Sequence, residues 1–117
     1  MNTITRPDFI QLIEAAHKSG SLRFSRQACL AWLAYYPGDL PVRLLYARTL
    51  IQAGQAERAV PVLTALCQAD PQQIDSWEQL QTALKQNLPD YAGNNSALSR
   101  ECQAALQALG VEVERDL

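Results

Sequence analysis

Two kinds of helix-ending residue recur in this chain at one interval. Gly54 follows Gly20 by 34 residues, and Pro71 follows Pro37 by 34 residues as well. Glycine tolerates the positive φ that ends many helices, and proline cannot continue a helix, so both residues mark helix boundaries. A fixed period of this size is typical of stacked repeats, in which each unit buries its apolar face against the next one.

Apolar residues recur at helical spacing between these boundaries. The first stripe consists of Phe9, Leu12, Ile13 and Ala16, on a helix that opens at Thr5 and ends at Gly20. We expect further helices over about 22–35, 40–53, 56–69 and 74–86. The helix over 22–35 is apolar nearly all round, which predicts that it is covered on more than one side.

The last part of the chain breaks the period. Residues 87–95 are rich in loop formers, so we expect a long loop there. A sixth helix is expected to begin at Asn95 or Ser96 and to end at Gly110. The tail after it is either frayed or folded back over this helix.

The units resemble tetratricopeptide repeats, which are helix–turn–helix units of 34 residues. The middle unit carries the pattern best, through Tyr46, Ala47, Leu50, Ala59, Leu63 and the closing Asp70-Pro71. Arg43 departs from the pattern, since an aromatic residue is usual there. The resemblance implies an all-α, right-handed stack of three antiparallel helical hairpins, a TPR-like α-solenoid of six main helices. It predicts a single domain with repeats at about 6–39, 40–73 and 74–109 and a tail at 110–117, the third repeat being atypical.

The same resemblance implies a protein-interaction scaffold whose first helices line a concave groove. We expect this groove to bind a peptide or an amphipathic helix of another protein. The residues expected to contact the partner are Ile10, Glu14, His17, Leu44, Leu45, Arg48, Ile51, Gln52 and Gln79. Alternatively, Leu44 and Leu45 are covered by neighbouring helices. A second functional hypothesis is self-association through small residues of the sixth helix, namely Ala97, Ala104 and Ala108.

Catalytic, cofactor and metal sites are not expected. His17 and Glu14 could share a helix face, but a solvated surface histidine is the commoner situation. The cysteines, Cys29, Cys67 and Cys102, fall on packing stripes and lack the spacing of a metal site. An odd cysteine count without a signal peptide predicts a cytoplasmic protein.

The net charge is −2, so nucleic acid is not an expected partner. No apolar run is long enough for membrane insertion.

Overall fold

The computed structural model describes residues 4–86 and 88–111, and for residues 88–96 it describes the backbone alone. Within these residues the chain forms six α-helices and no strand. Their bounds are α1 Arg6–Ser19, α2 Leu22–Tyr35, α3 Leu40–Gln52, α4 Ala56–Ala69, α5 Ile74–Gln86 and α6 Leu88–Ala108. The all-α fold is confirmed, and the first five helices end at or next to the expected residues.

The turns inside the hairpins repeat the same hydrogen bonds one period later. Gly20 and Gly54 have φ angles of 76° and 77°, a left-handed conformation that glycine adopts without strain. Ser21 N–H donates to Ala16 O at 2.8 Å, and the residues 34 positions further along make the same bond at the same length. The period of the sequence is therefore also a period of the backbone.

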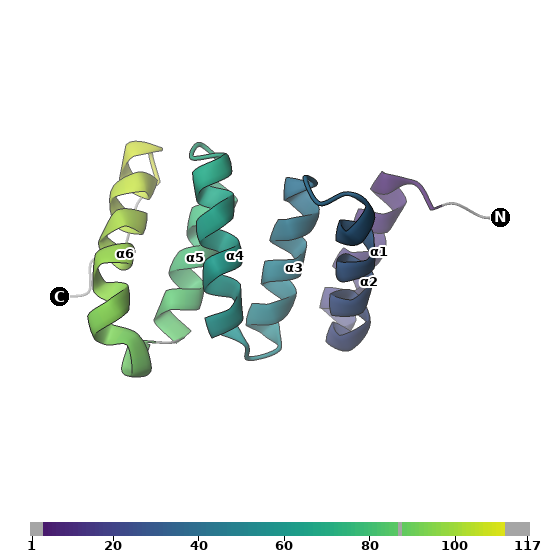
Figure 1. The fold of residues 1–117 in the computed structure, drawn as a ribbon, viewed down its shortest axis with the longest axis horizontal. Coiled ribbons are helices and arrows are strands. Elements are labelled where there is room, and N and C mark those ends of the chain that lie inside the picture. Colours follow the sequence, from purple (N-terminus) through teal and green to yellow (C-terminus); the bar gives the residue numbers. More distant parts are fainter. Residues whose placement is uncertain (1–3, 87, 112–117) are drawn as a thin grey trace.

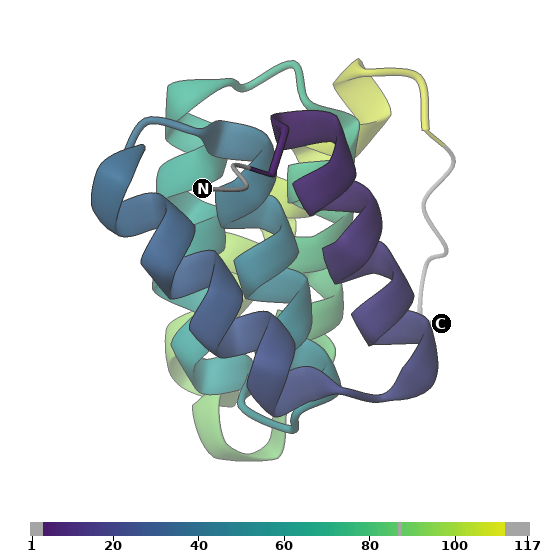
Figure 2. The same ribbon diagram turned by 90° about the vertical axis from the view of Figure 1, so that its right-hand side faces the viewer.

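Each helix packs against the next one along the chain, so the three hairpins form an elongated stack (Figure 1). The molecule measures 54 × 27 × 22 Å. Contacts also join α1 to α3 and α3 to α5, so the first helices of successive hairpins are neighbours. Figure 2 looks along the stack from its first hairpin and shows α1 and α2 on opposite sides. The first helices thus form a continuous row on one side of the molecule.

Two clusters of buried side chains hold the stack together. The larger cluster joins α3 to α6 and includes Leu50, Leu63, Trp77, Leu80 and Leu106. The smaller one joins α1, α2 and α3 through Phe9, Ile13, Cys29, Val42 and Leu45. Tyr46 of α3 packs against both clusters. Because α3 has packed neighbours on both sides, its sequence is apolar over most of its circumference.

The expected loop over residues 87–95 is wrong for residues 88–95, because α6 already begins at Leu88. Neither Asn95 nor Ser96 is therefore the helix cap. Pro89 lies in the first turn, where a missing N–H costs little. Helix propensity is a weak predictor that tertiary packing overrides, and α6 packs against α5. The helix ends as expected before Gly110, whose φ is 87°, while the tail from residue 112 lies outside the described residues.

Within the described residues α2 is covered on one side only, so the expected enclosure on more than one side is wrong. It packs against α1 and α3, and its buried residues are Ser25 and Cys29. Its outer side exposes Phe24, Leu30, Tyr35 and, at its C-terminal end, Tyr36. Tyr35 is 82% exposed. Leu12 of α1, expected on a packing stripe, is exposed too, because no described helix packs on that side of it.

Candidate functional site

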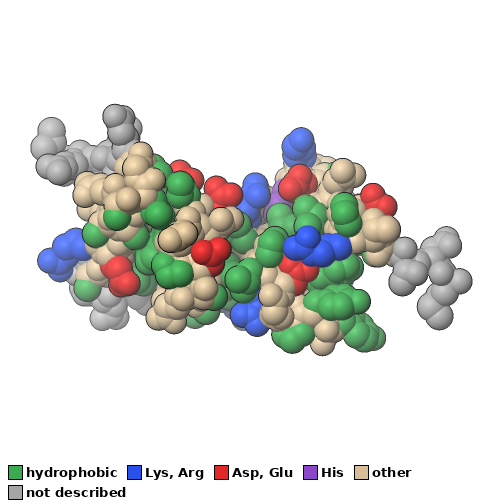
Figure 3. Space-filling model, turned by 90° about the horizontal axis from the view of Figure 1, so that it is seen from above, with side chains coloured by type: hydrophobic (Ala, Val, Ile, Leu, Met, Phe, Trp, Pro, Cys, Tyr) green, Lys and Arg blue, Asp and Glu red, His purple; other side chains and the backbone are tan. Residues whose placement is uncertain are grey.

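The first helices α1 and α3 enclose a polar hollow on the side that they share. Its lining consists of Glu14, His17, Lys18, Arg48 and Gln52. The hollow has a volume of about 320 Å³, and Figure 3 shows the histidine recessed between basic and acidic side chains. With a neutral imidazole, the lining has two positive charges, on Lys18 and Arg48, and one negative charge, on Glu14. The net charge of the hollow is therefore positive. This balance favours an acidic group on a ligand.

His17 is held in the hollow by buried hydroxyl groups. Thr49 Oγ1 donates to Leu45 O at 2.8 Å, so its lone pairs accept from His17 Nε2 at 2.6 Å and from Ser25 Oγ at 2.8 Å. This pattern places the proton of the neutral imidazole on Nε2. Nδ1 is then buried without a partner among the described residues. The expectation of a solvated surface histidine is therefore wrong.

The environment of His17 predicts a pH-dependent stability. Burial, and next the charge of Arg48, lower the pKa of His17 below its usual value of 6.5, although Glu14 acts in the opposite direction. Above that value the imidazole is neutral in both the folded and the unfolded chain. As the pH is lowered below 6.5, the unfolded chain binds the proton before the folded chain does. The free energy of unfolding should therefore decrease until the pH lies below the folded-state pKa of His17. Urea unfolding at about pH 7.5 and about pH 5.5 measures this loss.

His17→Gln is the matched control for that measurement. Glutamine keeps an N–H donor for Thr49 but does not titrate. Since the chain has one histidine, the variant should lose less stability between the two pH values than the wild type loses. An equal loss in both proteins would show that the fold does not disfavour the imidazolium form.

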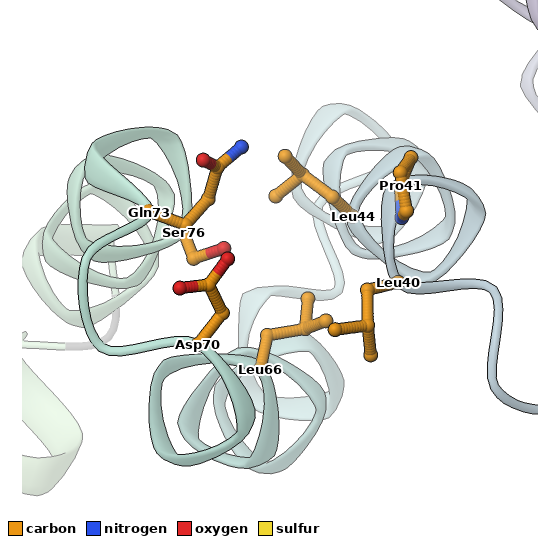
Figure 4. A pocket seen from close by; sticks show the side chains of 7 residues that line it. All are labelled: Leu40, Pro41, Leu44, Leu66, Asp70, Gln73 and Ser76. Atoms are coloured by element: carbon orange, nitrogen blue, oxygen red, sulfur yellow. The ribbon is translucent and has the colours of Figure 1, made fainter.

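A second cavity lies where α3 begins, α4 ends and α5 begins. It has a volume of about 290 Å³ and is lined by Leu40, Pro41, Leu44, Leu66, Asp70, Gln73 and Ser76. Figure 4 shows the leucines facing Asp70, Gln73 and Ser76 across the cavity. Leu40, Leu44, Arg48 and Gln52 follow one another at intervals of four residues, so they share a helix face. This set, the α3 stripe, lines both cavities.

Most of the expected groove residues lie at these cavities. Glu14, His17, Arg48 and Gln52 line the polar hollow, and Leu44 lines the second cavity. The structure therefore brings together residues of two repeats that the sequence placed on separate helices. Their role in binding a partner stays a prediction.

Two of the expected contact residues belong to the core. Leu45 is 5% exposed in the smaller cluster, and Ile51 is 7% exposed in the larger one. Neighbouring helices cover Leu45, as the alternative reading of the sequence held. Ile10 and Gln79 are half-buried on α1 and α5 and line neither cavity.

A cluster around Asp39 was missed from the sequence. Arg6 donates through Nε and Nη2 to the two carboxylate oxygens of Asp39, both at 2.9 Å, and Trp32 Nε1 donates to the same carboxylate at 2.9 Å. The bond from Arg6 is the main reason that the pKa of Asp39 is lowered. Arg6 and Asp39 are 33 residues apart, and His17 and Thr49 are 32 apart. A separation close to one period is the signal that could have found both pairs.

The three cysteines are free and buried. Burial raises the pKa of the Cys29 thiol to about 11, and those of Cys67 and Cys102 to about 12. Such thiols are protonated at neutral pH and are weak nucleophiles. They act as small hydrophobic residues of the core.

The described part of the chain holds no group of three metal-binding side chains able to coordinate an ion. None of its helices is long and apolar enough to cross a membrane. The expected self-association face, Ala97, Ala104 and Ala108, is exposed on α6, and its role stays a prediction.

Stacked antiparallel hairpins with a repeating backbone define this protein as a helical-repeat solenoid. The family model of the tetratricopeptide repeat matches residues 28–84, and the six helices are consistent with such repeats, so the resemblance is confirmed. The match runs from the middle of α2 into α5. No curated protein and no solved structure matches the chain. Tetratricopeptide repeats generally mediate protein–protein interactions.

Proposed function

We propose that this protein is a non-catalytic adaptor that binds a peptide or an amphipathic helix of a partner protein along the α3 stripe. The observation that carries the proposal is the pair of cavities that this one helix face joins. Leu44 lines the cavity at one end, and Arg48 and Gln52 line the hollow at the other. A segment lying along α3 would reach both.

The two cavities differ in chemistry, which gives the proposed ligand a direction. The end at Leu44 offers apolar carbon beside Asp70. The end at Arg48 offers Lys18 as a second cation. An acidic side chain of the ligand is therefore expected at the Arg48 end, where opposite charges would favour binding and orientation.

The buried free thiols agree with a reducing compartment such as the cytoplasm.

The test uses peptides selected by the wild-type protein from a random dodecapeptide library. Their affinities are then measured by fluorescence anisotropy for the wild type and for Arg48→Glu. Reversing this charge replaces attraction by repulsion in the hollow, so we expect about tenfold weaker binding. Arg48 is half-buried and makes no ion pair with another described residue, so the thermal midpoint should stay close to that of the wild type.

Arg58→Glu is the control, because it makes the same charge change at an exposed position of α4 that lines neither cavity. Its affinity should stay within about twofold of the wild type. If both variants bind like the wild type, the binding site lies away from α3. If no peptide is enriched, the proposal of a peptide-binding groove fails.

A further inference from the structure

The second cavity is at the small end of the range for ligand pockets. Its volume of about 290 Å³ compares with roughly 300–1,000 Å³ for typical pockets, and it has room for a long side chain. It sits between the ends of three helices, so its walls come from two hairpins (Figure 4). Leu44, half-buried at its edge, also belongs to the α3 stripe.

The walls of this cavity are chemically different. Leu40, Leu44 and Leu66 present apolar carbon on one side, and Asp70, Gln73 and Ser76 present oxygen atoms opposite them (Figure 4). Asp70 Oδ1 accepts from Gln72 N–H at 3.3 Å. No lysine or arginine among the described side chains forms an ion pair with Asp70. A carboxylate has about four acceptor positions, so Asp70 can accept further donors.

The first hairpin shows how the corresponding position is filled. Leu40 stands 34 residues after Arg6, and Gln73 stands 34 residues after Asp39. In the first hairpin, Arg6 supplies a cation that donates twice to Asp39. In the second hairpin Leu40 replaces that arginine and Gln73 replaces Asp39, and the acid at the cavity is Asp70, which stands 34 residues after Tyr36. The second cavity therefore has the apolar wall and the carboxylate, but none of the described lysine or arginine side chains lines it.

Acidic side chains lie on the helix beside the cavity. Asp75 and Glu78 are exposed on α5, the helix that carries Ser76. The field at this end of the α3 stripe thus favours a positive group, opposite to the preference of the polar hollow.

We propose that the second cavity holds one long basic side chain, lysine or arginine, of the partner protein. The methylene groups lie against Leu40, Leu44 and Leu66, as long basic side chains do on apolar surfaces. The cationic end donates to Asp70, a charge-assisted hydrogen bond. This inference rests on the proposed function, since it adds a basic residue at one end of the ligand to the acidic residue expected at the other.

The test uses n-pentylamine, which is an alkylammonium ion at neutral pH, and 1-pentanol as its neutral analogue. Binding is followed by chemical shifts of the ¹⁵N-labelled protein. The chain has two tryptophans, and the Trp77 indole donates to Pro71 O at 2.8 Å, next to Asp70. The Trp32 indole, bound to Asp39, is the internal reference. The amine should shift the Trp77 indole signal and leave that of Trp32 in place, and it should bind about three- to fivefold more tightly than the alcohol.

Asp70→Asn separates the role of the charge from that of the apolar wall. Asparagine retains an oxygen for Gln72 N–H, so the turn should persist while the charge is lost. The variant should bind the amine about three- to fivefold more weakly and bind the alcohol as the wild type does. Asp75→Asn, which removes an exposed acid that does not line the cavity, is the control and should change amine binding less than about twofold.

The inference is overturned by an unmoved Trp77 signal, by equal binding of amine and alcohol, or by undiminished amine binding to Asp70→Asn. None of these results affects the proposed function, because the peptide test depends on Arg48 in the other cavity. Conversely, a failure of the peptide test with a positive amine result would leave a cation pocket without a peptide groove.

Discussion

Replacing Trp77 with alanine is expected to lower the free energy of unfolding by about 3–5 kcal/mol. The side chain is 7% exposed and packs within the larger core cluster. Its indole N–H also donates to Pro71 O at 2.8 Å, which fixes the turn between α4 and α5. Truncation would leave a cavity at the boundary between the second and third hairpins. Thermal or urea unfolding at neutral pH measures the loss.

Trp77→Phe is the matched variant for this substitution. It retains an aromatic ring in the core and removes the indole donor, so a smaller loss of roughly 1–2 kcal/mol is expected. An unchanged unfolding midpoint for Trp77→Ala would contradict the packing of the third hairpin against the second.

Enlarging Ala59 to leucine is expected to lower the free energy of unfolding by about 1–3 kcal/mol. Ala59 is fully buried on α4, and Ser25, one period earlier on α2, is fully buried as well. Both hairpins thus have a small residue where their second helix packs closely, and a larger side chain would push helices apart or leave its preferred rotamer. The measurement is again chemical unfolding.

Ala65→Leu provides the comparison, because Ala65 is exposed on the same helix. Both substitutions add the same atoms to α4, but the exposed one should stay within about 0.5 kcal/mol of the wild type. Equal effects at the two positions would mean that helix propensity, and not the close packing at Ala59, determines the loss.

Helix boundaries could be predicted because the interactions that end a helix are local. Thr5 caps α1 by accepting from Asp8 N–H at 3.3 Å, as its sequence context indicates. Gly20 and Gly54 supply the positive φ that their turns require. The start of α6 was missed because its loop-forming residues lie inside a helix that packs against α5.

Side-chain burial could be predicted only in part. Leu44 and Leu45 are adjacent and equally apolar, yet Leu45 is buried and Leu44 is half-buried beside a cavity. Periodicity cannot separate such neighbours on a helix that is packed on both sides. On α2 the prediction overestimated burial, since the apolar residues Leu30 and Tyr35 are exposed.

The polar contacts of the site depend on the stacking of hairpins. His17 contacts Thr49, and Arg6 contacts Asp39, because successive repeats stack on each other. Stacking places residues that are about one period apart side by side. These pairs have no local sequence signal, so the sequence identified the face of α3 but not the two cavities that divide it.

Whether the partner lies along α3 can be measured from the amide chemical shifts of the ¹⁵N-labelled protein bound to a selected peptide. If it does, the largest amide shifts should cluster at Glu14, His17, Leu44, Arg48 and Gln52 on the row of first helices. The exposed apolar side of α2, with Phe24, Leu30 and Tyr35, is the competing surface. If the largest shifts occur on α2 and the signals of the α3 stripe do not move, the partner does not bind along α3.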